Sequence, residues 1–155
     1  MGNKFFVFFL AVLFFGNSSC VKNEVCKSKT VDSERGTIAG YAAANLIVGT
    51  EHSSGVYYQI TNPGNGATPT GTSTVTVKYT GKLLNGQIFD NQTTTAVSIN
   101  LSQVIEGWKI GLPLIQKGGT IRLIIPSSLG YGCVGFGTVP GNSILYFEIE
   151  LVDVN

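Results

Sequence analysis

Apolar and polar residues alternate at every second position in five segments between residue 56 and the C-terminus. Because successive side chains of a strand point to opposite faces of a sheet, this period of two predicts strands with one buried face. Asn85 and Gly86 are typical of a tight hairpin turn between two strands. The apolar positions are Val56, Tyr58 and Ile60; Val75, Val77 and Tyr79; Val97, Ile99 and Leu101; Ile121, Leu123 and Ile125; and Phe147, Ile149 and Leu151.

One segment among these strands has helical spacing instead. Ile105, Trp108 and Leu112 recur three and four residues apart, so they line one side of a short helix. Pro113 limits this helix, because proline removes a hydrogen-bond donor and crowds the preceding turn. The sequence therefore predicts an α+β fold, in which an antiparallel sheet of about five strands wraps on one short helix.

A second helix is expected before the strands, from Ser33 to Leu46. Ile38, Tyr41 and Ala42 give it a narrow apolar stripe, and Asp32 or Ser33 could cap it. Such a helix packs on the outside of the domain or, alternatively, docks a partner or a second copy of the chain. The polar stretch of residues 21–31 has no period and indicates a flexible spacer.

The first nineteen residues have the anatomy of a signal peptide. Lys4 precedes an apolar run from Phe5 to Phe15, which is too short to span a bilayer comfortably. Small residues before Cys20 are typical of a bacterial lipoprotein, in which Cys20 would become the lipidated first residue; the alternative is a plain signal peptide. We expect a signal peptide at 1–19, a lipidated tether with a short helix at 20–53 and a folded domain at 54–155.

Charge and composition argue against several kinds of partner. Ten Lys and Arg residues stand against nine Asp and Glu, and one of the ten, Lys4, would leave with the signal peptide. No basic surface is then available for nucleic acid. His52 is the only histidine and no CxxC spacing occurs, so neither a metal site nor a Ser/His/Asp set is expected. An envelope location would permit a disulfide between Cys26 and Cys133, but one lies in the tether and the other in a loop, so we expect unpaired cysteines, with a disulfide as the alternative.

Three sequence blocks stand in a fixed order in the predicted domain. They read VTVKYTGKLLNGQIFDN from Val75, QVIEGWKIGL from Gln103 and IPSSLGYG from Ile125, and the chain closes on ILYFEIEL from Ile144. Together they resemble the FKBP-type peptidyl-prolyl isomerases from about Ser54 to the C-terminus. The resemblance implies an isomerase that acts on proline-containing polypeptides, needs no cofactor and binds macrolide-type inhibitors.

The same resemblance implies roles for individual residues. The Tyr131 hydroxyl would donate to the carbonyl of the isomerising bond, Asp90 would orient polar groups at the pocket edge, and Phe89 would form a wall. The implied substrate-binding residues are Tyr79, Val104, Ile105, Trp108, Val139 and Phe147, with Trp108 as the floor and the Ile105 N–H as a donor to a substrate carbonyl. Alternatively, Trp108, Phe147 and Val104 are ordinary core residues, and Asp90 merely caps a turn at residues 91–93.

Two departures from the family pattern affect the pocket. Val97 stands where many members carry an aromatic wall, so one side should be wider and less apolar. No arginine follows Asp90 at residues 91–96, which would leave Asp90 without its usual ion-pair partner.

These observations predict a prolyl isomerase that assists the folding of exported proteins. It would be lipid-anchored in a bacterial cell envelope, on the periplasmic side of the outer membrane. Because the chain also resembles gliding-associated FKBP-like lipoproteins, the alternative is a non-catalytic binding module or an accessory subunit of a gliding-type machine.

Overall fold

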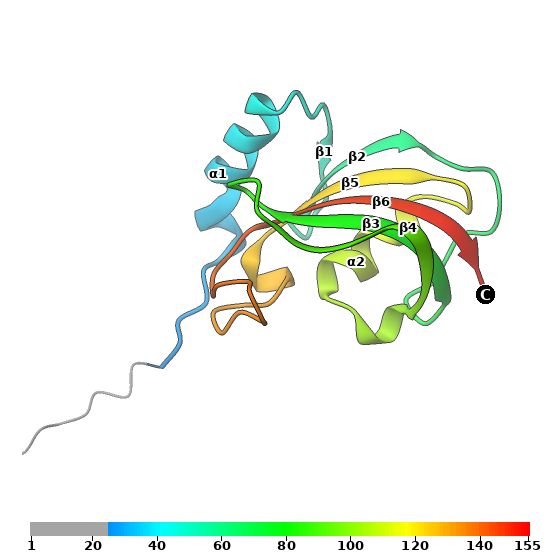
Figure 1. Ribbon diagram of the computed structural model, residues 1–155. Coiled ribbons are helices and arrows are strands. Elements are labelled where there is room, and N and C mark those ends of the chain that lie inside the picture. The colour runs from blue at the N-terminus through cyan, green and yellow to red at the C-terminus, as the bar shows by residue number, and fades with distance from the viewer. Residues whose placement is uncertain (1–24) are drawn as a thin grey trace, which may run out of the picture.

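A computed structural model describes residues 25–155, which form a six-stranded antiparallel sheet with one short helix against its concave face (Figure 1). The order in the sheet is β1-β2-β5-β6-β3-β4. The strands are β1 (Thr50–Glu51), β2 (Tyr57–Asn62), β3 (Thr74–Leu83), β4 (Ile88–Asn100), β5 (Thr120–Ile125) and β6 (Leu145–Val154). The helices are α1 (Val31–Ala44) and α2 (Glu106–Gly111), and the 3₁₀ turns are η1 (Leu101–Gln103), η2 (Leu112–Leu114) and η3 (Ser127–Leu129).

The alternation along the strands divides the apolar residues between two clusters. Leu123 of β5 and Phe147 of β6 face α2 and join the main core with Trp108 and Leu112. Their neighbours in sequence, Ile124 and Tyr146, point to the opposite face and pack against Ile38 and Ala42 of α1. The main core is therefore enclosed between sheet and α2, while α1 covers one end of the outer face (Figure 1).

The predicted α+β class, with its antiparallel sheet around one short helix, is confirmed. As predicted, the β3–β4 hairpin turns at Asn85 and Gly86, where Gly86 has a positive φ of 89°. The helix carrying Trp108 passes into a 3₁₀ turn at Leu112, because Pro113 cannot continue an α-helix.

Three elements differ from the sequence prediction. The strand expected around Val97 is part of the 13-residue β4, whose pairing with β3 shifts register between Val77 and Tyr79 and so breaks the alternation. Thr30, not Asp32 or Ser33, caps α1 through its side chain. The sheet begins at β1, before residue 54, with only two residues to carry a pattern.

The N-terminal segment is attached to the domain, contrary to our expectation of a spacer and free cysteines. Cys26 and Cys133 form a disulfide whose Cα atoms lie 5.7 Å apart, well within bridging distance. Asn142 supports this contact, since its side chain bonds the backbone of both Lys27 and Lys29 at 3.1 Å. The free-cysteine prediction was wrong because 107 positions of sequence separate two residues that the fold brings together.

Other N-terminal predictions concern residues beyond those described. The signal peptide and the lipidation of Cys20 lie outside residues 25–155. No helix within residues 25–155 has both the length and the apolar character needed to cross a membrane.

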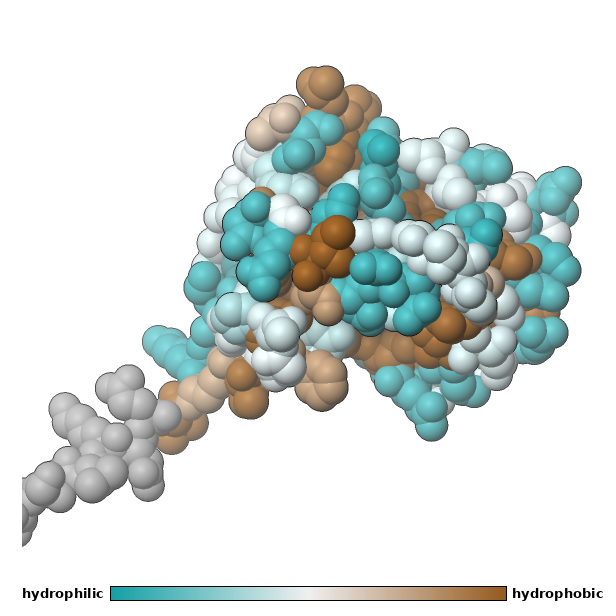
Figure 2. All heavy atoms as spheres, viewed as in Figure 1, coloured by the Kyte–Doolittle hydropathy of each residue, from teal (hydrophilic) through white to brown (hydrophobic). Residues whose placement is uncertain are grey.

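Leu46 and Val48, which follow α1, are 84% and 83% exposed, and Figure 2 shows hydrophobic atoms at the end of the molecule where α1 ends.

Candidate active site

A cavity of about 330 Å³ opens between the concave face of the sheet, the start of α2 and the loop that follows η3. Strands β3, β4 and β6 supply one side, and α2 with the residues just before it supplies the base. The loop after η3 completes the rim. The lining residues are Tyr79, Asp90, Ile99, Gln103, Val104, Ile105, Trp108, Tyr131, Phe136 and Phe147.

The base of the cavity is Trp108, which is only 4% exposed. Its ring meets Tyr79 and Phe147 edge to face, with centroids 5.1 Å and 5.3 Å away and interplanar angles of 86° and 83°. Such perpendicular contacts are the favoured geometry of aromatic pairs and fix the indole plane. The Trp108 Nε1 atom is buried and has no hydrogen-bond partner among residues 25–155. Trp108 is thus a core residue and a cavity residue at once.

Phe89 and Gly81 shape the wall together. Phe89 packs on Phe147 at 5.5 Å and lies 6.5 Å from the Tyr131 ring, both as perpendicular contacts. A Cβ atom at Gly81 would lie 2.7 Å from the Phe147 ring and 2.8 Å from that of Phe89, which is closer than real Cβ contacts. The aromatic wall therefore requires glycine at this position of β3.

Two phenols and one carboxylate are the ionisable groups of the cavity. The Tyr79 hydroxyl donates to Asp90 Oδ2 at 2.6 Å. Burial, followed by the hydrogen bond to Asp90, raises the pKa of Tyr79 above its ordinary value. Burial also raises the pKa of Tyr131, and the charge of Asp90 raises it further. Both phenols therefore stay protonated, and able to donate, beyond the ordinary tyrosine value of about 10.

Asp90 does not cap a turn, because residues 91–93 continue β4. The alternative role raised by the sequence was therefore wrong, and the hydrogen bond from Tyr79 accounts for the orientation of the carboxylate. Within residues 25–155 no cation forms an ion pair with Asp90.

The loop after η3 carries two aromatic residues onto the rim. Phe136 stacks on Tyr131 with centroids 5.3 Å apart and ring planes 20° apart, although 70% of Phe136 is exposed. Gly135 and Gly137 flank Phe136 with positive φ angles of 77° and 55°. Backbone bonds of 3.0 Å and 2.9 Å join Phe136 to Val139, so this part of the loop is a closed turn.

The structure brings most of the predicted site residues to one cavity. Phe89 and Val139 stand behind it: Phe89 supports the wall, and Val139 is buried beneath the rim. The residues that line it as predicted are Tyr79, Asp90, Val104, Ile105, Trp108, Tyr131 and Phe147.

Sequence reasoning missed Ile99, Gln103 and Phe136, which also line the cavity. Ile99 shares a strand face with Val97, so the alternation could have indicated it. Phe136 lies between two glycines, an unusual setting for a core aromatic and the signal that could have identified it.

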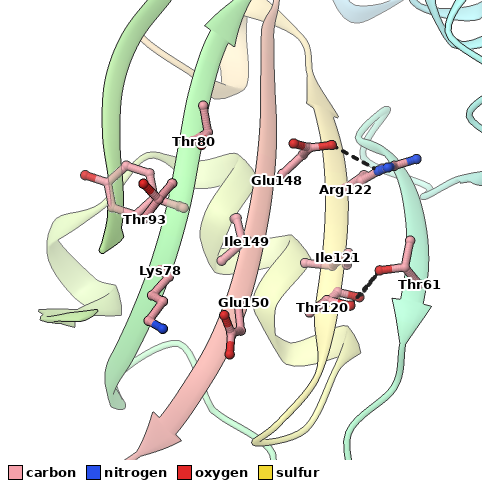
Figure 3. A pocket seen from close by; sticks show the side chains of 11 residues that line it. Thr61, Lys78, Thr80, Thr93, Thr120, Ile121, Arg122, Glu148, Ile149 and Glu150 are labelled. Carbon is pink, nitrogen blue, oxygen red and sulfur yellow. Dashed lines mark hydrogen bonds and ion pairs between the residues drawn. The ribbon is translucent and has the colours of Figure 1, made fainter. Parts of the chain in front are cut away.

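A larger hollow of about 410 Å³ lies over the outer face of the sheet and has a different character. Figure 3 shows Lys78, Thr80 and Glu150 projecting from the strands there, with α2 behind the sheet. Two pairs of its polar groups bond each other: Arg122 pairs with Glu148 at 3.2 Å, and the Thr61 and Thr120 hydroxyls lie 2.6 Å apart (Figure 3). Such a surface is typical of the solvated side of a sheet. Residues 25–155 include no cluster of His, Cys, Asp or Glu suited to a metal ion.

Comparisons with known proteins agree with this geometry. Residues 66–152 match the family of FKBP-type peptidyl-prolyl cis-trans isomerases. FkpA of Escherichia coli, an FKBP-type peptidyl-prolyl cis-trans isomerase, is 45% identical over 104 residues, covering 66% of this chain and 38% of FkpA. The chain thus spans less than half the length of the curated relatives it matches.

Two solved structures have the same fold. The crystal structure of FkpA from Escherichia coli superposes with a TM-score of 0.72 and 37% identity, over 81% of this chain and 61% of that one. A peptidyl-prolyl cis-trans isomerase from Pseudomonas syringae superposes with a TM-score of 0.69 and 31% identity, over 83% of this chain and 98% of that one. On the family match and the shared fold, this chain belongs to the FKBP-type peptidyl-prolyl cis-trans isomerase family.

Proposed function

We propose that this chain catalyses cis/trans isomerisation of X–Pro peptide bonds in the cavity above Trp108. The barrier is about 18–20 kcal/mol because the amide is partly double-bonded. In the twisted transition state the resonance is lost, and with it much of the charge separation between oxygen and nitrogen. An apolar cavity disfavours the planar, polar ground state relative to the twisted state, so no nucleophile is needed. A ten-thousand-fold acceleration requires that the transition state be stabilised relative to the ground state by only about 5.5 kcal/mol.

The cavity offers each group that this chemistry needs. The proline ring would lie on Trp108 between Tyr79 and Phe147, where the walls are aromatic. The Tyr131 hydroxyl would donate to the carbonyl of the rotating bond. Ile105 precedes α2 in an extended conformation, so its N–H lies outside the helix and would donate a hydrogen bond to a second substrate carbonyl. Asp90, held by Tyr79, would orient polar groups at the edge. The observation that carries the proposal is the buried Trp108 ring at the base of a cavity that the Tyr131 phenol also lines.

Isomerisation of a short X–Pro peptide tests this function directly. The protein is the full-length chain in detergent, with Cys20→Ser to remove the third cysteine. We expect acceleration of the cis-to-trans step, with a large loss in the Tyr131→Phe, Phe89→Ala double variant and an unchanged circular dichroism spectrum. Tyr146→Phe is the matched control, because Tyr146 is a buried phenol that bonds Glu148 outside the cavity. If the folded protein does not accelerate isomerisation, whichever residue precedes proline in the peptide, the proposed enzymatic function is refuted.

We further infer that the chain is a lipoprotein of a bacterial envelope whose clients are exported proteins. The support is the apolar run before Cys20 and the small residues that precede this cysteine. Labelled palmitate should enter the wild-type protein in cells and should not enter Cys20→Ser. Fractionation should find the wild type with the outer membrane and the variant in the soluble periplasm. Labelling of the variant would exclude Cys20 as the anchor.

A binding module that lacks catalysis, such as an accessory subunit of a gliding-type machine, is the second candidate. It is favoured by the absence of an ion pair at Asp90 among the described residues and by Val97 at the expected aromatic position. Trp108 is the only tryptophan, so its fluorescence reports occupancy of the cavity. Tight binding of a proline peptide without acceleration would favour this candidate. The same signal tests whether a macrolide-type inhibitor binds.

A further inference from the structure

The N-terminal segment contacts the loop of the candidate active site at three separate places. We call residues 26–34 the strap and residues 127–142 the pocket loop, which carries Tyr131 and Phe136. Figure 1 shows the blue N-terminal segment running beside the orange loop. The contacts are a disulfide, a pair of hydrogen bonds and a buried carboxylate.

The disulfide joins the strap to the middle of the pocket loop. Cys133 lies two residues after Tyr131 and three before Phe136, so the bond to Cys26 restrains the part of the loop between the two stacked rings. At the end of the loop, Asn142 forms two hydrogen bonds with the strap. Its Oδ1 accepts from the Lys29 N–H and its Nδ2 donates to the Lys27 carbonyl, both at 3.1 Å. The Asn142 N–H also donates to the Gly132 carbonyl at 2.8 Å, which closes the loop on itself.

Glu34 of α1 holds the beginning of the pocket loop. It is only 2% exposed, and its Oε2 accepts from the Ser127 N–H at 2.8 Å. The Ser127 carbonyl in turn accepts from the Gly130 and Gly132 N–H groups at 3.1 Å and 2.8 Å. These residues flank Tyr131 on both sides. Burying a carboxyl group costs free energy unless it is hydrogen-bonded, and the bond from the Ser127 N–H meets part of this need while it holds the turn that precedes Tyr131.

We propose that the strap is a positioning element for the active-site loop, so that substrate binding depends on the closed Cys26–Cys133 disulfide. Cys26, Glu34 and Asn142 touch no part of the cavity and act only through the loop. The effect on catalysis rests on the proposed isomerase function, whereas the effect on the loop does not. Opening the strap should leave the floor at Trp108 in place and release the rim, which weakens substrate binding more than the bond rotation itself.

The first test follows amide hydrogen exchange of Gly132 and Phe136 in the full-length Cys20→Ser chain. Dithiothreitol opens the bond: its two thiols give two electrons and two protons to the disulfide, leaving two cysteine thiols and a cyclic disulfide of the reagent. We expect exchange at both amides to accelerate by about ten-fold or more, as for a segment that opens locally. Ile38→Ala is the control, because it weakens α1 packing without touching the loop. Equal acceleration in that control, or none after reduction, overturns the proposal whatever the catalytic result.

The second test separates KM from kcat with an X–Pro peptide. The Cys26→Ser, Cys133→Ser chain should show KM raised by about five- to ten-fold with kcat changed less than two-fold. Ile38→Ala should keep the wild-type KM and kcat, provided that the assay temperature lies below the unfolding midpoint of this variant. Glu34→Ala should act in the same direction, and Glu34→Gln, which retains an acceptor oxygen, should restore the wild-type KM. Reduced wild-type protein gives the same comparison without a substitution. An unchanged KM in all of these overturns the proposal.

Failure of the isomerase function gives a different pattern. If neither the oxidised nor the reduced protein accelerates isomerisation, the peptide can still be titrated against Trp108 fluorescence. Weaker binding after reduction, together with faster loop exchange, would support the strap and reject the enzyme. Equal binding in both forms would reject the strap.

Discussion

Gly81 shows how one absent side chain determines the shape of the candidate site. In the sheet Gly81 pairs with Asp90 of β4 and with Phe147 of β6, and a side chain on it would meet the rings of Phe89 and Phe147. The sequence block around Tyr79 includes this glycine, but spacing alone does not say which glycine a ring will approach. The place of Tyr79 and Trp108 in the cavity could be predicted because their family positions are matched, while the need for glycine emerges only from packing.

Gly81→Ala should therefore impair the pocket more than its single methyl group suggests. The added Cβ must displace rings that are already packed, and overpacking a core costs about 1–3 kcal/mol. We expect a loss of that size in the free energy of unfolding, measured in urea, with a fall in kcat/KM for an X–Pro peptide. Gly36→Ala is the matched control, since a Cβ there meets nothing within 4 Å and should stabilise α1 by about 0.5–1 kcal/mol. Equal behaviour of the two variants would contradict the steric role of Gly81.

Tyr131→Phe should keep the stacked pair with Phe136 and remove only the donor. A hydrogen bond is worth about 0.5–1.5 kcal/mol, so kcat/KM should fall by roughly two- to thirteen-fold. The circular dichroism spectrum and the urea midpoint should change little, as in Tyr146→Phe, which should retain full activity. An activity loss in both variants would show that any buried phenol matters and would remove the specific role of Tyr131.

The pH dependence of the wild type follows from the same hydroxyl. Burial raises the pKa of Tyr131, so the neutral donor persists as pH rises through the ordinary tyrosine value of about 10. The stability gained by burying the neutral phenol is present below that value and is lost only as pH rises through the higher folded-state pKa. We expect a flat kcat/KM between about pH 7 and pH 10 for a substrate without ionisable groups. A decline centred below 10 would contradict the raised pKa.

At the scale of elements, the placement of α2 depends on small residues that no periodicity indicates. The apolar spacing of Ile105, Trp108 and Leu112 predicts the helix and Pro113 its end, and both predictions are confirmed. The sequence does not show how close α2 lies to β5. Gly107 and Gly111 face Ile125 and Leu123 so closely that neither position has room for a Cβ.

Gly111→Ala should for this reason destabilise the fold even though alanine is the better helix former. Alanine gains about 1 kcal/mol of helix propensity over glycine. Its Cβ would lie 2.6 Å from the fully buried Leu123 side chain, and the strain of about 1–3 kcal/mol outweighs that gain. Urea unfolding should show a net loss. Gly40→Ala in α1, where the Cβ meets nothing within 4 Å, should show a net gain; stabilisation by both would mean that α2 can move away from β5.

Strand prediction succeeded where a strand has one buried face and failed at its irregularities. The buried Val75 and Val77 alternate with partly buried polar neighbours, so β3 was predictable. In β4 the register shifts place partly buried and exposed residues out of phase, and only the segment around Val97 kept a readable alternation. The two residues of β1 are strand only because β2 lies beside them.

At the scale of the whole molecule, the least predictable feature is the closure of the strap on the pocket loop. Local patterns determine helices and strands, but the Cys26–Cys133 contact depends on how α1 packs against β5 and β6 and returns its N-terminal end to the loop. The role of Glu34 is equally hard to predict from the sequence. It lies in the first turn of α1, a position that is typical of an exposed acidic residue that stabilises the helix dipole. Both residues acquire their roles from the tertiary fold.

The disulfide joins two residues that are 107 positions apart in the sequence, so we expect it to contribute strongly to global stability. A cross-link restricts the unfolded chain, and typical contributions are about 2–4 kcal/mol. We expect the free energy of unfolding of oxidised Cys20→Ser protein, measured in urea, to fall on reduction by an amount in that range, with the native circular dichroism spectrum retained at low urea. The Cys26→Ser, Cys133→Ser chain should match the reduced protein.

Because the stabilisation acts mainly on the unfolded state while the strap acts on the native loop, the two effects of the disulfide can be separated. A loss of stability on reduction without faster loop exchange would mean that the disulfide contributes to stability alone. Both effects together would mean that one bond serves the fold and its candidate active site.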